Sequence, residues 1–131
     1  MSTTTHTVKN AKGTAERIAV THDRYNAVQY DFYIPVAIWS HPSVKTFLTR
    51  LLSIEQGATI FNGLTGVWQG EQEQTRIYRI ILRSDRYQRD NVTSAFAGEI
   101  GRLMAELAVS QFAQQAVLYT ETDIFMNLSV K

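Results

Sequence analysis

Cysteine is absent from this chain of 131 residues, which excludes disulfides, thiolate nucleophiles and zinc sites built on sulfur. No apolar run approaches the roughly 20 residues of a membrane-spanning helix, and the opening MSTTTHTVKN lacks the apolar stretch of a secretory signal. Neither sign of charge dominates, since 13 lysines and arginines stand against 12 aspartates and glutamates. The net charge of +1 provides no global field for nucleic acid or anionic lipid. We therefore expect a cytoplasmic protein without a membrane segment.

Recognisable catalytic and cofactor motifs are missing as well. The three histidines, His6, His22 and His41, are far apart in the sequence, and none has a second histidine at metal-ligand spacing. The chain has no glycine-rich phosphate loop of the P-loop kind, and its serines and threonines have no visible base partner. The sequence therefore predicts neither a metal site nor a cofactor, and it gives no support for nucleophilic catalysis.

The composition that remains is that of an ordinary globular protein. Hydrophobic residues make up 44% of the chain and charged residues 19%, and the length suits one domain with one sizeable core. Residues 1–23 are rich in Thr, Lys, Asn and Gly without a convincing hydrophobic period. We therefore predict a flexible N-terminal arm at 1–23 and a single domain at 24–131.

Two hydrophobic periods alternate along that domain. Every second residue is apolar at 28–38, which is typical of a strand, whereas VKTFLTRLL and VTSAFAGEIGRLMAEL have helical spacing. The expected elements are a strand at 27–39, a helix at 42–56, a strand at 58–68, a strand at 75–83, a helix at 90–113 and a strand at 115–128. This order predicts an α+β protein of the ferredoxin-like βαββαβ class, with an antiparallel sheet and two helices on one face.

The stretch GLTGVWQGEQEQTRIYRIIL, at 63–82, is predicted to be a β-hairpin with the polar link QGEQEQ. Gly63 and Gly66 interrupt its first strand, which indicates a bulge or a close backbone approach. Glu71 and Glu73 lie in the link. Two carboxylates in a desolvated pocket can act as an acid and a base, whereas on a hairpin tip they are solvated turn charges. Glu73, which is nearer the strand, is the better candidate for a functional role.

Arginines are concentrated after the hairpin, within fourteen positions and interleaved with tyrosines. They are Arg76, Arg79, Arg83, Arg86 and Arg89. Such a group can clamp RNA, or it can form ion pairs across a subunit interface. If Tyr78, Ile80 and Leu82 share the core face, Arg79 and Arg83 lie on the opposite face, which lacks the paired exposed aromatics of an RNA-binding sheet. The pattern therefore disfavours nucleic acid as a partner.

The face opposite the helices is partly apolar in this arrangement, and six residues would lie uncovered on it. They are Thr59, Phe61, Ile77, Ile81, Val117 and Tyr119. An uncovered apolar sheet face usually marks association. We therefore expect a homo-oligomer with pockets at the seams between its subunits.

Two segments, GATIFNGLTGVWQGE and QQAVLYTETDI, give the chain a family resemblance over about residues 30–125. With the strands and helices between them, they resemble the small PII-like proteins, which are trimers of ferredoxin-like subunits. The resemblance implies a PII-like homotrimer that binds an adenosine-containing small molecule in the clefts between subunits. PII signalling proteins carry a long partner-binding loop where this chain has only QGEQEQ.

The hairpin LTGVWQGEQEQTRIYRI also looks like that of phage-encoded enzymes that degrade S-adenosylmethionine, in which a glutamate lies just before the third strand. Glu73 matches that position, so the resemblance implies a catalytic Glu73. Those enzymes are lyases that yield methylthioadenosine and homoserine lactone. The substrate's own carboxylate is the nucleophile, and the protein mainly positions it and places a carboxylate near the sulfonium.

The same resemblance implies the ligand-binding residues. Trp68, Tyr78 and Tyr119 offer stacking surfaces, and Gln114 and Gln115 offer hydrogen bonds. The family has a second acidic residue where this chain has the two glutamines, and Glu121 is the nearest acid that can take its place. The alternative is a non-enzymatic interaction or regulatory module that binds a partner protein, and the missing acid favours this alternative.

Overall fold

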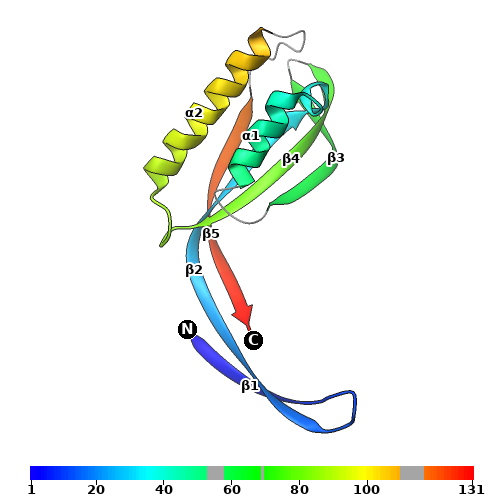
Figure 1. Cartoon of the computed structure of the whole chain (residues 1–131), viewed down its shortest axis with the longest axis vertical. Helices are drawn as coiled ribbons and strands as arrows, with labels where there is room; N and C mark the ends of the chain where they lie inside the picture. Colours follow the sequence, from blue (N-terminus) through cyan, green and yellow to red (C-terminus); the bar gives the residue numbers. More distant parts are fainter. Residues whose placement is uncertain (53–57, 69, 110–116) are drawn as a thin grey trace.

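One antiparallel sheet and two α-helices make up the computed structural model, which describes residues 1–52, 58–68, 70–109 and 117–131 (Figure 1). The elements in chain order are β1 (Ser2–Lys9), β2 (Ala15–Pro35), a 3-10 turn (Val36–Ile38), α1 (Pro42–Leu52), β3 (Thr59–Trp68), β4 (Glu71–Arg83), α2 (Arg89–Ala108) and β5 (Leu118–Val130). Neither α1 nor α2, as far as the described residues extend, is long and apolar enough to cross a bilayer. A cytoplasmic location stays a prediction.

The long strand β2 organises the sheet because three other strands pair with it. Its first part pairs with β1, from Ala15 with Lys9 to His22 with Ser2. Its last part pairs with β4 along the same edge, ending with Pro35 opposite Thr75. The other edge pairs with β5 over thirteen positions, and β3 pairs with the outer edge of β4. The sheet is therefore a broad layer at one end and a narrow ribbon at the other (Figure 1).

The core lies between the broad end of the sheet and the two helices. Alternate residues of the last part of β2, from Val28 to Ile34, point into it, and so do alternate residues of β4. The buried residues include Val28, Tyr30, Phe32 and Ile34 of β2, Tyr78, Ile80 and Leu82 of β4, Val44, Phe47 and Leu51 of α1, and Val92, Phe96, Leu103 and Leu107 of α2. The predicted alternation is therefore confirmed at 28–34 and 78–82. The strand that was expected to reach residue 39 ends at Pro35, because residues 36–38 form the 3-10 turn, in which Val36 is 41% exposed.

Phe96 of α2 lies at the centre of this core and is fully buried. Its ring meets the rings of Tyr30 and Phe32 edge-on, with centroids 4.8 and 5.1 Å away. Tyr119 of β5 closes the cluster, because its ring stacks on Phe32 at 5.3 Å. Edge-to-face and stacked pairs are favourable beyond the area that they bury, so this cluster ties α2 to both β2 and β5.

The expected ferredoxin-like βαββαβ class, with two helices on one face, is wrong for this chain. The chain is mostly strand, and a fifth strand, β1, together with the first part of β2 and the end of β5, extends the sheet well beyond the helices (Figure 1). The expectation failed because it treated the N-terminal residues as lying outside the sheet. The PII-like oligomer that was expected with that class is not visible in a single chain.

The residues at 1–23, for which a flexible arm is predicted, are paired as the β1–β2 ribbon. The first strand is rich in threonine, whose branched side chain favours an extended backbone although it is polar. Asn10 closes the turn, since its side-chain oxygen accepts hydrogen bonds from the backbone N–H groups of Lys12 and Thr14 at 2.9 and 3.0 Å. β2 runs through residue 23 without a break, and the flexibility predicted for 1–23 stays a prediction.

The predicted hairpin is confirmed, with a shorter link than expected. β3 ends at Trp68 and β4 begins at Glu71, so most of QGEQEQ belongs to β4. The predicted irregularity is also present: the register shifts between Phe61 and Leu64, and Gly63 there has a φ of 71°. The close approach is at Gly66, where an added Cβ would lie 3.2 Å from the hydroxyl oxygen of Thr75.

The helix starts agree with prediction to within one residue, since α1 begins at Pro42 and α2 at Arg89. The predicted ends at 56 and 113, and the start of the last strand at 115, lie outside the described residues. β5 is one continuous strand.

Candidate functional site

Among the predicted site residues that the structure describes, Glu73 is separated from Tyr78, Tyr119 and Glu121 within a single copy of the chain. Gln114 and Gln115 lie outside the described residues, and so does the side chain of Trp68. Tyr78 is buried on the core face of β4, where its hydroxyl accepts a hydrogen bond from Arg76 at 3.2 Å. Its ring therefore serves the core and offers no surface for a ligand to stack on.

The other predicted aromatic, Tyr119, also belongs to the core side of the sheet. It stacks on Phe32 and contacts Phe96 at 6.3 Å between ring centroids. Val117, expected on the uncovered face together with Tyr119, packs against the core as well. Both residues were assigned to the wrong face, because the register of β5 against β2 cannot be obtained from the sequence of β5 alone.

Glu73 and Glu121 are separated both along the sheet and across it. Glu73 is half-buried on β4 opposite Gly66, on the face turned away from the helices. Glu121 pairs with Tyr30 on the helix side, and Tyr30 in turn pairs with Ile80. Ile80 is seven residues along β4 from Glu73, which corresponds to roughly 23 Å at about 3.3 Å per residue. The two carboxylates cannot share a ligand in one copy.

Glu121 is also neutralised by its surroundings. A nitrogen of the Arg89 guanidinium lies 2.8 Å from Glu121, and another lies 2.8 Å from Asp123. The hydrogen bond to Glu121 raises the pKa of Arg89, so the arginine stays charged. Glu121 therefore holds the start of α2 to β5.

The sheet face turned away from α1 and α2, here named the open face, has a buried ion pair at its centre. The Asp31 side chain is only 9% exposed and accepts two hydrogen bonds from Arg79, at 2.9 and 3.0 Å. With its amide oxygen facing the arginine, Gln29 accepts from the same guanidinium at 3.3 Å. Arg79 also lies over the ring of Phe61, 4.8 Å from the centroid. These contacts hold Arg79 against the sheet. The hydrogen bond to Asp31 raises the pKa of Arg79.

Apolar side chains surround this ion pair on the open face. Tyr33 of β2 and Ile77 and Ile81 of β4 are half-buried, and Leu118 of β5 is 55% exposed. Their shared side follows from the register, because residues paired across strands point to the same face. An antiparallel sheet that faces water on one side normally has polar residues there.

The five arginines after the hairpin, for which RNA binding was disfavoured and ion pairs across a subunit interface were the alternative, are largely paired within the chain. Arg79 and Arg89 have the acidic partners described above, and Arg83 forms a two-pronged ion pair with Asp85 while lying 3.6 Å from the ring centroid of Tyr25. Arg76 lies 3.9 Å from the ring centroid of Trp39. Contacts within the chain therefore account for four of the five arginines, and Arg86 is exposed.

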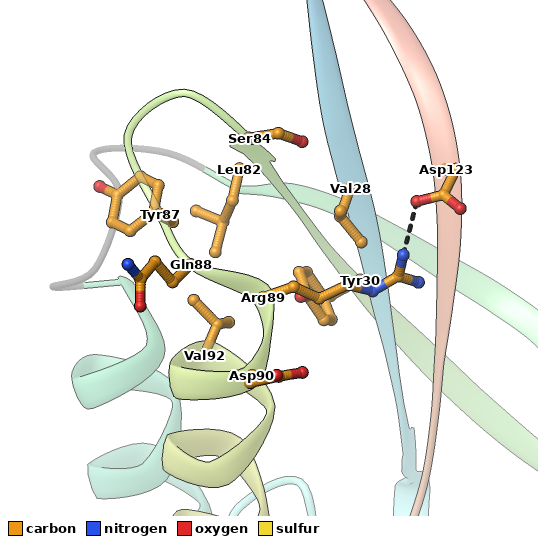
Figure 2. Close-up of a pocket in the computed structure, with 10 residues that line it drawn as sticks. All are labelled: Val28, Tyr30, Leu82, Ser84, Tyr87, Gln88, Arg89, Asp90, Val92 and Asp123. Carbon is orange, nitrogen blue, oxygen red and sulfur yellow. Dashed lines mark hydrogen bonds and ion pairs between the residues drawn. The ribbon is translucent and has the colours of Figure 1, made fainter.

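A hollow of about 420 Å³, which the sequence did not reveal, lies beside the start of α2 (Figure 2). It is lined by Val28, Tyr30, Leu82, Ser84, Tyr87, Gln88, Arg89, Asp90, Val92 and Asp123. Side chains from β2, β4, β5 and α2 converge on it (Figure 2). One sequence signal was available: Glu121 and Asp123 are two positions apart, so on a strand they share a face and can meet the same cation.

Two histidines that are distant in sequence meet on the ribbon. The Nε2 atoms of His6 and His22 each lie 2.9 Å from the hydroxyl oxygen of Thr4, and Nδ1 of His22 lies 2.7 Å from the hydroxyl oxygen of Ser129. This chain of polar contacts ties β1, β2 and β5 together. Within the described residues, no group of three or more His, Asp or Glu side chains could hold a metal ion.

Comparison of the chain with protein-family models, with curated proteins and with solved structures gives no match. The PII-like and lyase resemblances therefore rest on the quoted sequence motifs.

Proposed function

We propose that the chain works as a homo-oligomer whose copies associate through the open face, and that the seams between copies bind an adenosine-containing small molecule. The observation that supports association is the open face itself. A partly buried ion pair, Asp31 with Arg79, lies at its centre, and half-buried apolar residues lie beside it. Three copies are expected from the family resemblance.

A second copy of the chain suits this face for a physical reason. Arg79 is already paired, so covering it leaves no unpaired charge, and its flat guanidinium and the neighbouring Ile77 and Ile81 offer a continuous contact surface. Apolar surface removed from water stabilises a complex by about 25 cal/mol per Å². Burial of the open face is therefore most favourable against a partner that also presents an apolar surface.

The association is tested by measuring mass in solution for the wild type and two matched variants. Ile81→Lys places a charge on the open face, and Ile60→Lys places the same charge on the other side of the sheet, where Ile60 is 51% exposed. We expect Ile81→Lys to dissociate the oligomer and Ile60→Lys to leave it intact. A wild-type chain that stays monomeric at high concentration would overturn the proposal.

The lyase activity is the enzymatic form of this proposal, and the placement of Glu73 supports it. Glu73 is half-buried on the open face near the start of β4, so association there would bring it to a seam. In the reaction the substrate's carboxylate oxygen attacks the carbon of the amino-acid side chain that is attached to sulfur. The bond between that carbon and sulfur breaks, and its electron pair stays on sulfur. The products are homoserine lactone and neutral methylthioadenosine, and Glu73 supplies negative charge near the sulfonium.

The non-enzymatic module that binds a partner protein is the second candidate, and the separation of Glu73 from Glu121 favours it. Incubation with S-adenosylmethionine distinguishes the two by the appearance of methylthioadenosine. The lyase predicts turnover that Glu73→Gln abolishes while the oligomer persists. Absence of turnover, combined with absence of a thermal shift from adenine compounds, leaves the module alone.

A further inference from the structure

We infer that the hollow beside the start of α2 is a binding site for a small organic amine, whose apolar body enters the hollow and whose ammonium group meets the acidic rim. This site goes beyond the proposed function, because it lies on the helix side of the sheet and is complete within one copy (Figure 2). Its shape, its floor and its charge each contribute to the inference.

The floor of the hollow is apolar and rigid. Val28, Leu82 and Val92 lie within it and are at most 8% exposed, and the ring of Tyr30 adjoins them. They come from β2, β4 and α2, which the core holds together. A volume of about 420 Å³ lies within the range of pockets that bind small molecules. A short aliphatic or aromatic body can therefore lie against this floor without a rearrangement of the backbone.

The rim is acidic overall although it contains an arginine. Arg89 lies between Glu121 and Asp123 at 2.8 Å from each, so its charge is compensated. Asp90 adds a further carboxylate, which has no ion-pair partner among the described residues. The charged residues that line the hollow, Arg89, Asp90 and Asp123, have a net charge of −1, and Glu121 beside Arg89 adds a further negative charge. Burial, followed in size by the nearby Glu121, raises the pKa of the Tyr30 phenol, which therefore stays neutral.

Other ligand classes fit this lining less well. An anion would gain from the first turn of α2, but it would face Asp90 and Asp123 at close range. A bare metal ion would find no set of three ligands among the described residues. A neutral apolar molecule would use the floor and leave the carboxylates without a role. An amine uses both, because its cation replaces water at the acids while its body covers the floor.

The test uses three probes of the same shape that differ in charge: phenethylamine, 3-phenylpropionate and 3-phenylpropanol. Backbone amide chemical shifts report where and how tightly each probe binds. We expect phenethylamine to shift the amides of residues 84–92 in a saturable manner, the alcohol to bind more weakly and the anion to bind least. Equal or tighter binding of 3-phenylpropionate, or the absence of shifts at 84–92 with phenethylamine, would overturn the inference.

Variants separate charge recognition from a general effect. Asp123→Asn removes one rim charge and leaves Arg89 less compensated, so amine binding should weaken roughly two- to fivefold. Glu106→Gln removes the same charge far along α2 and should leave binding unchanged. Ser84→Trp, at an exposed rim position, should block the hollow for all three probes. Amine affinity that is equal in Asp123→Asn and Glu106→Gln would contradict the assigned role of the acidic rim.

Amine binding by the Ile81→Lys variant distinguishes a failure of this inference from a failure of the proposed function. The Ile81→Lys variant carries its change on the open face, away from the hollow. We expect it to bind phenethylamine as the wild type does, whether or not the wild type is an oligomer. Loss of amine binding in that variant would mean that the site needs the open face, and the inference of a site complete in one copy would be wrong.

Discussion

The ion pair between Asp31 and Arg79 gives the sharpest prediction about the open face. The double-mutant cycle consists of Asp31→Asn, Arg79→Met and the combination of both. The Asp31 side chain is 9% exposed and the Arg79 side chain 32%, and two charge-assisted hydrogen bonds join them. Exposed pairs couple by about 0.2–1 kcal/mol, and removing one partner of a buried pair costs about 3–5 kcal/mol. The intermediate burial predicts a coupling of about 2 kcal/mol.

The single substitutions should differ in cost. Arg79→Met keeps a long side chain over Phe61 but leaves a carboxylate with little access to water, so it should lower the free energy of unfolding by about 2–3 kcal/mol. Asp31→Asn removes the charge and keeps one acceptor, so it should cost about 1–2 kcal/mol. Urea unfolding followed by tryptophan fluorescence measures all four proteins.

A matched control comes from the second two-pronged pair, Arg83 with Asp85. Its hydrogen bonds are as short, but the Asp85 side chain is 54% exposed, so water and salt screen it. The same cycle on that pair should give a clearly smaller coupling that falls further when salt is added. Equal couplings for the two pairs would refute the argument that the open face shields Asp31 and Arg79 from water.

Three further predictions concern the core, the hairpin and the buried phenol. Phe96→Ala should lower the free energy of unfolding by about 3–5 kcal/mol, because it removes a fully buried ring from the aromatic cluster; a loss under about 1 kcal/mol in urea unfolding would contradict that packing. Gly70→Ala should lower the free energy of unfolding by about 1–2 kcal/mol, because Gly70 has a φ of 80°. Gly98→Ala, on the exposed side of α2, should raise it by up to about 1 kcal/mol. Thermal unfolding that ranks the two variants in the opposite order would contradict the turn geometry at Gly70. The pKa of the Tyr30 phenol is raised in the folded state, so its contribution to stability is fully present below the ordinary pKa of 10.0 and is lost as the pH rises through the raised pKa. Tyr30→Phe should therefore lose less stability at alkaline pH than the wild type. Identical profiles of stability against pH for the two proteins would exclude the effect.

Much of the local structure was predictable because side-chain alternation and glycine chemistry act over short distances. Tyr78, Ile80 and Leu82 point to the core as their spacing predicted, and the bulge at Gly63 follows from a residue that tolerates positive φ. The same alternation shows why Tyr78 was a poor ligand candidate. A side chain on the core face of a covered strand cannot also form the wall of a cleft.

The ribbon and the candidate site were not predictable in the same way, because they depend on contacts between distant segments. The polar threonines of β1 gave no apolar period, and only pairing with β2 reveals them as a strand. Glu73 and Glu121 were placed in one site by resemblance, and the registers of two strand pairs put them on opposite faces. A shift of one residue in either register would reverse a face, and no short-range signal sets it.

The most direct test of the central claim is the mass of the wild-type chain in solution, measured by sedimentation equilibrium over a wide range of concentrations. Association through the open face predicts a whole multiple of the 14.9 kDa chain, three copies if the family resemblance holds, and a return to one copy in Ile81→Lys. A mass of one chain at every concentration, or an oligomer that Ile81→Lys leaves intact, would contradict the account.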